Sequence, residues 1–166
     1  MGNLILIRVP DEFRMRVSSF CTERGYPFSD ATVTLIDPSL LGKIPGLQQK
    51  LQSFCLAQRD FNMVLGGAAR HGDQLLYLGV LPGMVSMVRE RLMGYLKIPP
   101  GEKPYRPHLT LMHSSAGRGL NMEKMLADAK SVFTPPYQFT VGAFELYTQK
   151  GNEPFKPAAT IHFTGR

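Results

Sequence analysis

The sequence predicts a single α+β domain built from two similar halves. Some segments repeat apolar residues with the period of a strand and others with the period of a helix. The order helix, strand, helix, strand, strand occurs twice, over about residues 11–80 and again over about 82–164. At 166 residues, with no low-complexity segment or linker, the chain has the length of one domain. We therefore expect one domain, 1–166, with two pseudo-symmetric lobes over those two ranges.

The first half follows an opening strand predicted at residues 4–9, where an apolar run ends at Pro10. Asp11 can cap the helix that comes next. Gly and Pro residues separate the later elements. The predicted elements are a helix from residue 11 to about 25, a strand at 31–36, a helix at about 47–55, and strands at 61–65 and 74–80 joined by a loop with a mobile tip at 66–73.

The second half repeats this order after Pro82. Its apolar residues again alternate between helical spacing and strand spacing. The predicted elements are a helix at 85–96, a strand at 107–112, a Gly/Ser loop at 114–119, a helix at 122–129, and strands at 137–147 and 159–163.

The charge balance favours an anionic ligand. The formal net charge is +6 and the sequence pI is about 9.5. Because the basic residues are scattered, we expect a compact phosphate-bearing ligand and no long duplex nucleic acid. No apolar run has the length of a membrane span, so no membrane association is expected. Cys21 and Cys55 lack metal-type spacing and fit reduced core positions, which favours a cytoplasmic location.

One short stretch, residues 106–113, carries the clearest chemical signal. Pro107 disfavours a helix, and Leu109 alternates with its polar neighbours as in a strand. His108 and Thr110 therefore share one face. A hydroxyl can donate to a phosphoryl oxygen while an imidazole moves a proton, so the pair can act on a phosphoryl group.

The internal repeat gives this stretch a partner. When the halves are aligned, Thr34 matches Thr110 and Thr32 matches His108, so that Thr-Val-Thr-Leu corresponds to His-Leu-Thr-Leu. Two halves packed pseudo-symmetrically would bring both motif strands to one cleft.

These motifs resemble those of the 2H phosphoesterase superfamily, also called the 2′-5′ RNA ligase-like family. Residues 106–111 look like its second His-x-Thr motif, and residues 31–38 look like its first, with Thr32 where the family has His. Residues 4–12 look like its opening strand and helix start. The resemblance covers nearly the whole chain. It implies a bilobal fold in which two antiparallel sheets flank a central cleft, with helices outside.

The resemblance also implies an activity on phosphodiesters such as 2′,3′-cyclic phosphates, 2′-5′ linkages and cyclic nucleotides, without a metal or other cofactor. In the family, one His acts as base, the other as acid, and two Thr hydroxyls hold the phosphoryl oxygens. The matching catalytic positions here are His108, Thr110, Thr34 and Thr32. The expected partner is a small nucleotide or an RNA end with a cyclic phosphate, and the expected state is a monomer.

Thr32 cannot exchange a proton near neutral pH, and losing one acid–base partner costs about 10²- to 10⁴-fold in rate. The site then either catalyses the reaction slowly, uses another side chain for proton transfer, or binds its ligand without catalysis. His71 lies in the predicted hairpin loop and can swing inward or stay solvated. His113 is five positions from His108, which predicts the opposite face. His162, in the terminal strand, is expected to lie on the sheet without a role in the site.

Two residues beside the second motif are candidates for substrate binding, together with His71. Tyr105 can stack on a base and Arg106 can pair with phosphate, although ordinary surface packing fits them equally. We expect a protein that binds a small nucleotide and cleaves its phosphodiester with His108. The alternatives are a binding protein that sequesters or senses the nucleotide and an interaction domain with a vestigial site.

Overall fold

The computed structural model describes residues 2–28, 30–113 and 121–165, so the Gly/Ser loop predicted at 114–119 lies outside it. The strands are β1 (Gly2–Arg8), β2 (Thr32–Ile36), β3 (Phe61–His71), β4 (Leu75–Val80), β5 (His108–His113), β6 (Tyr137–Val141), β7 (Ala143–Gln149) and β8 (Lys156–His162). The helices are α1 (Asp11–Thr22), α2 (Pro38–Leu41), α3 (Leu47–Ala57), α4 (Met84–Leu96) and α5 (Met122–Val132).

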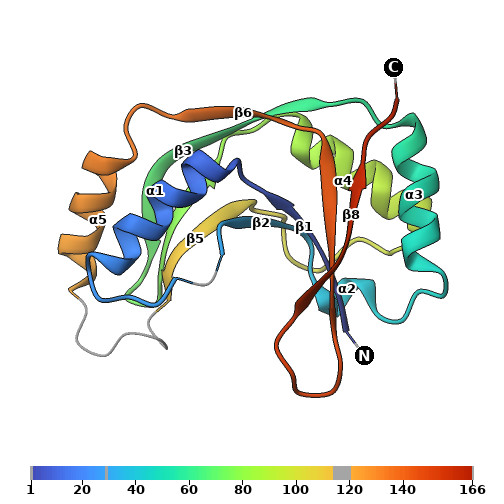
Figure 1. Cartoon of the computed structure of the whole chain (residues 1–166), viewed down its shortest axis with the longest axis horizontal. Coiled ribbons are helices and arrows are strands. Elements are labelled where there is room, and N and C mark those ends of the chain that lie inside the picture. The colour runs from blue at the N-terminus through green and yellow to red at the C-terminus, as the bar shows by residue number, and fades with distance from the viewer. Residues whose placement is uncertain (1, 29, 114–120, 166) are drawn as a thin grey trace.

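The strands form one curled antiparallel sheet in the order β6-β3-β4-β5-β2-β1-β7-β8 (Figure 1). The two expected sheets are therefore joined. At the junction, β2 and β5 pair through Val33 and Leu109, whereas the other strand pairs run over several residues. The α+β class and the two-part architecture are confirmed, with the two parts meeting at the motif strands.

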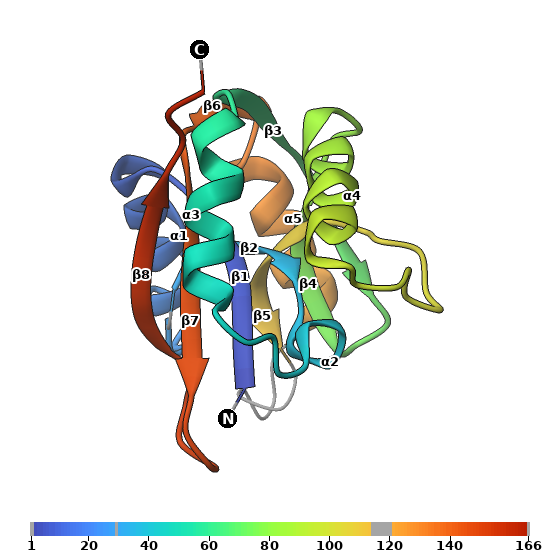
Figure 2. The same ribbon diagram turned by 90° about the vertical axis from the view of Figure 1, so that its right-hand side faces the viewer.

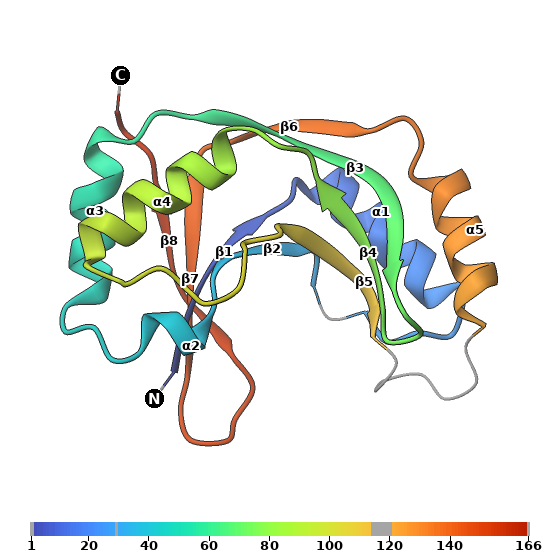
Figure 3. The same ribbon diagram turned by 180° about the vertical axis from the view of Figure 1, so that it is seen from behind.

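The helices cover the two ends of this sheet separately. α1 and α5 lie with β3, β4 and β5, whereas α3 lies against β8, and α4 lies beside α3 and against β2 and β3 (Figures 1 and 3). Figure 2 shows α3 alongside β7 and β8. Stacking of Phe13 on Tyr137, with ring centroids 4.3 Å apart, ties α1 to β6.

The two half-sheets do not coincide with the sequence segments 11–80 and 82–164. The strand predicted at 137–147 is divided at Gly142, because β6 pairs with β3 while β7 pairs with β1. Each half-sheet therefore combines strands from both sequence halves.

The hairpin prediction was wrong about its tip. β3 runs to His71 and β4 begins at Leu75, so most of the loop predicted at 66–73 is hydrogen-bonded strand. Its small residues carry no strand signal of their own. Pairing with β4 nevertheless extends β3, and His71 lies opposite Leu75.

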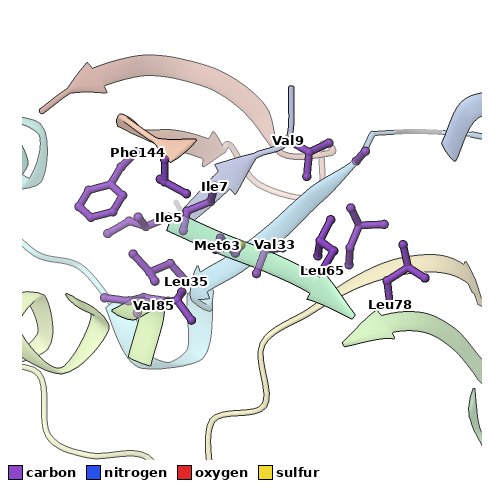
Figure 4. Packing of buried hydrophobic residues seen from close by; sticks show 14 of the residues in the cluster. Ile5, Ile7, Val9, Val33, Leu35, Met63, Leu65, Leu78, Val85 and Phe144 are labelled. Atoms are coloured by element: carbon purple, nitrogen blue, oxygen red, sulfur yellow. The ribbon is translucent and has the colours of Figure 1, made fainter. Parts of the chain in front are cut away.

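The core lies on one face of the sheet, where Ile5, Ile7, Val33 and Leu35 are at most 1% exposed (Figure 4). Residues alternate between the faces of a strand, so their neighbours Thr32 and Thr34 lie on the opposite face. Both cysteines are buried and free, as expected. Among the described residues, no helix has the length and apolar character to cross a bilayer.

Candidate functional site

The candidate site lies where the two half-sheets meet. Val33 and Leu109 are opposite each other and fully buried. In an antiparallel pair the neighbouring positions are then also opposite, which places Thr34 across from His108 and Thr32 across from Thr110. The sheet therefore brings the four predicted catalytic side chains to adjacent positions on one face.

The motif strands share a backbone pattern that sequence periodicity does not show. In each strand the first position is partly exposed, the third is exposed, and the second, fourth and fifth are buried. Each motif strand also pairs with its outer neighbour through a register shift. The pairing of β2 with β1 shifts between Ile5 and Leu6 of β1, and the pairing of β5 with β4 shifts between Leu76 and Tyr77 of β4. This shared irregularity supports the pseudo-symmetric match of Thr32 with His108.

The same irregularity overturns the face expected for His113. Two consecutive buried residues, Leu111 and Met112, interrupt the alternation of β5. His113 lies opposite Leu75, which shares a face with Tyr77, the partner of Thr110. The bulge adds one residue to β5, so the side chains after it point to the opposite face from the one that regular alternation predicts. His113 is therefore on the His108 side of the sheet.

The backbone sets the tautomer of His108. Its Nδ1 lies 2.9 Å from the Arg106 carbonyl oxygen. A carbonyl can only accept, so Nδ1 carries the proton and the neutral ring presents Nε2 as its acceptor. Tyr77 packs edge-on against the imidazole, with centroids 5.4 Å apart. His108 is thus oriented to exchange a proton through Nε2.

Two cavities meet at this site. The smaller one, about 420 Å³, contains both motif pairs in its lining. The larger one is about 820 Å³ and extends under the segment 100–106. Thr34 and His108 line both cavities. A group held between these two side chains therefore has space on either side.

Tyr105 and Arg106 lie in the lining of the larger cavity. The Tyr105 hydroxyl donates to the Thr34 carbonyl at 2.9 Å, and the Arg89 guanidinium lies 4.2 Å from its ring centroid. Burial strongly raises the pKa of Tyr105, which keeps it a neutral donor. Arg89 covers one face of the Tyr105 ring and also donates to the Leu35 carbonyl at 2.9 Å. Stacking of Tyr105 on a base stays a prediction for the other face.

A charged network that sequence reasoning missed borders Thr32. Asp30 accepts hydrogen bonds from Arg14 Nε at 3.1 Å and from the Tyr147 hydroxyl at 3.1 Å. Arg8 donates to that hydroxyl at 2.8 Å and lies 3.7 Å from Asp30. Burial opposes ionisation of Asp30, but the hydrogen bonds outweigh it and lower the carboxyl pKa. Asp30 lines the smaller cavity.

Two histidines stand apart from this arrangement. His71 lies at the end of β3 and is in the described lining of neither cavity. His162 lies opposite Ala143 on β8, at the outer edge of the sheet. Within residues 2–28, 30–113 and 121–165, no three His, Cys, Asp or Glu side chains gather as they would around a metal ion.

Fold and site together describe a two-part phosphoesterase-like protein. A family model described as the 2′-5′ RNA ligase superfamily matches residues 9–153. The chain belongs to this superfamily. No curated protein matches it.

Solved structures show the same fold at low sequence identity. TT0787 of Thermus thermophilus aligns with a TM-score of 0.70 and 16% identity over 99% of both chains. E. coli LigT complexed with 3′-AMP aligns with a TM-score of 0.65 and 18% identity over 98% of both chains. LigT complexed with NADP+ gives a TM-score of 0.64 and 19% identity over 98% of each chain.

Proposed function

We propose that this protein binds a small nucleotide or an RNA end at its central site and cleaves a phosphodiester there without a metal ion. The observation that carries the proposal is the register of β2 and β5, which sets Thr34 opposite His108 beside Thr110 and Thr32. Family membership supports the reaction class.

In the proposed reaction, the Thr34 and Thr110 hydroxyls donate to the non-bridging phosphoryl oxygens. His108 Nε2 accepts a proton from the attacking water, because Nδ1 is held by the Arg106 carbonyl. A bond forms between the water oxygen and phosphorus, and the bond from phosphorus to the leaving oxygen breaks, with the leaving oxygen taking a proton from solvent. The products are a phosphate monoester and an alcohol.

The two cavities support a nucleotide as ligand. Arg89, Lys103 and Arg106 line the larger one, so cationic side chains are available to phosphate groups. Tyr26 and Phe28 line the smaller one and give a base or ribose apolar surface. Solved complexes of E. coli LigT include those with 3′-AMP, ATP and NADP+, which are nucleotides.

A second candidate is a protein of the same fold that holds a nucleotide without turning it over. Thr32 favours this alternative, because the position paired by symmetry with His108 carries no imidazole. Binding through the hydroxyls and the cationic cavity does not need a second proton-transfer group.

Two measurements on one preparation separate these functions. Titration calorimetry with 3′-AMP measures binding, and chromatography after incubation with adenosine 2′,3′-cyclic phosphate measures turnover. We expect binding that is lost in a Thr34→Ala/His108→Ala/Thr110→Ala variant, together with slow formation of a monophosphate. Binding without product supports the second candidate. Equal binding by the triple variant would contradict both.

A further inference from the structure

Thr32 leaves one side of the central site without a proton-transfer group. The smaller cavity has one imidazole in its described lining, that of His108. Tyr26 also lines it, but its hydroxyl is bonded to the backbone N–H of His113 at 2.6 Å. Asp30 is engaged by Arg14, Tyr147 and the Ala31 N–H. Tyr26 and Asp30 are therefore already hydrogen-bonded within the protein.

Arg8 lies beside this side of the site, as does Arg14, which donates to Asp30 through Nε and lies 5.3 Å from the Phe28 ring centroid. Arg8 is the register partner of Thr32 on β1, so the two residues lie on neighbouring strands about 5 Å apart and share a face. The Arg8 side chain is 39% exposed, and its Nη2 is 3.7 Å from the cavity-lining Asp30. Arg8 is in the described lining of neither cavity, but its contact with Asp30 places the guanidinium next to a residue that lines the smaller one.

The guanidinium is held in place but retains free donors. Tyr147 accepts from its Nη2 at 2.8 Å and in turn donates to Asp30, which fixes the head group. The hydrogen bond to Tyr147 also raises the pKa of Arg8, and a guanidinium is charged near neutral pH in any case. In the described part of the chain, its Nε and Nη1 make no hydrogen bond. A planar guanidinium with two free nitrogens, which together carry three N–H bonds, suits a phosphoryl oxygen.

We propose that Arg8 takes the place of the missing imidazole, contacting the phosphoryl group from the Thr32 side and stabilising the leaving oxygen as its bond to phosphorus breaks. This inference rests on the proposed function. Because a guanidinium cannot accept a proton, the role of base falls to His108 alone. Water gives its proton to His108, and the leaving oxygen departs against Arg8 and takes a proton from solvent. His108 then returns its proton to solvent.

The test combines Arg8→Gln with Thr32→His. We expect Arg8→Gln to weaken 3′-AMP binding about tenfold and to lower kcat on adenosine 2′,3′-cyclic phosphate about 10²-fold. In the Thr32→His background, where an imidazole supplies the same role, Arg8→Gln should lower kcat less than about threefold. Arg91→Gln is the matched control, because Arg91 bonds Gln58 away from both cavities.

The pH profile gives an independent readout. With one imidazole, kcat should rise with pH and then level off, whereas Thr32→His should add a descending limb. The Arg8→Lys variant keeps the positive charge, so it can replace Arg8→Gln in the binding measurement if Arg8→Gln does not fold. It should bind 3′-AMP more weakly than wild type, since an ammonium lacks the planar fork.

Three outcomes would overturn the inference. Wild-type binding and kcat in both Arg8 variants would make Arg8 a structural ion-pair residue and leave the proposed function intact. Equal losses from Arg8→Gln in the wild-type and Thr32→His backgrounds would place the action of Arg8 elsewhere. If wild type neither binds 3′-AMP nor forms product, the proposed function fails and this inference fails with it.

Discussion

The strands β2 and β5 have the same backbone pattern but different chemistry. In both, the first motif residue is partly exposed and the residue directly after it is buried, and both have a register shift against the strand beside them. Val33 and Leu109 join them in the core. The first motif position is Thr32 in one strand and His108 in the other. Packing of the apolar positions maintains this geometry, so the fold tolerates a change in the residue that carries the chemistry.

The surroundings of the two positions differ accordingly. His108 lies between an aromatic ring and a backbone carbonyl, which orient a proton-transfer group. Thr32 lies beside Arg8 and a carboxylate-centred network, which supply charge. We therefore expect the β5 side of the site to move protons and the β2 side to bind the phosphoryl group.

The largest expected effect is at His108. His108→Ala should lower turnover of adenosine 2′,3′-cyclic phosphate by at least about 10²-fold, because it removes the general base. Thermal melting should change little, since the side chain is partly exposed. His162→Ala, on the outer edge strand, is the matched control and should keep wild-type turnover. Equal losses in both variants would contradict a special role for β5.

The next effect is at the paired threonines. Thr34→Val and Thr110→Val each remove one hydroxyl and should weaken 3′-AMP binding about tenfold, the value of a hydrogen bond to a charged group. The loss should be larger for Thr34, which lines both cavities. Calorimetry with Thr34→Ser, which keeps a hydroxyl, provides the control. Unchanged binding in both Val variants would mean that the phosphate lies elsewhere.

Restoring the symmetry of the two strands should increase activity. Thr32→His puts a second imidazole on the face shared with Thr34, and we expect a gain in turnover of at least about tenfold, the low end for one positioned acid or base. Steady-state kinetics measure this gain. If wild type is already fast and the variant is slower, another residue performs the role and Thr32 serves specificity.

The smallest effect concerns stability on the β2 side. The hydrogen bonds to Asp30 lower its pKa despite burial, so they stabilise the fold above the unfolded-state value of about 3.9, and this contribution is lost as pH falls through the folded-state value. Asp30→Asn should lower the melting temperature by about 2–6 °C at pH 7. The difference should shrink below pH 4. A difference that does not depend on pH would exclude the carboxylate charge as its cause.

The motif strands and most of the order of elements were predictable, because alternating apolar residues and the Pro107 break are local signals. The short helix α2 and the division of 137–147 into β6 and β7 were not predicted. The position of His113 was not predictable either, since the bulge at Leu111 depends on pairing with β4. The crossing at Gly142 likewise depends on which strands pair.

The network around Asp30 had only a weak local signal, namely that Asp30 is two residues before Thr32 and so shares its face. Its partners Arg8 and Tyr147 are 139 positions apart in the sequence. No pattern within one segment indicates such a contact. It arises only when β7 pairs with β1 and brings Tyr147 beside the first motif.

A crystal structure of the protein with 3′-AMP would show directly where the phosphate binds. We expect the phosphate between the Thr34 and Thr110 hydroxyls, with His108 Nε2 within hydrogen-bond distance and the Arg8 guanidinium on the Thr32 side. A nucleotide bound away from β2 and β5, or a phosphate that leaves His108 without contact, would contradict this expectation.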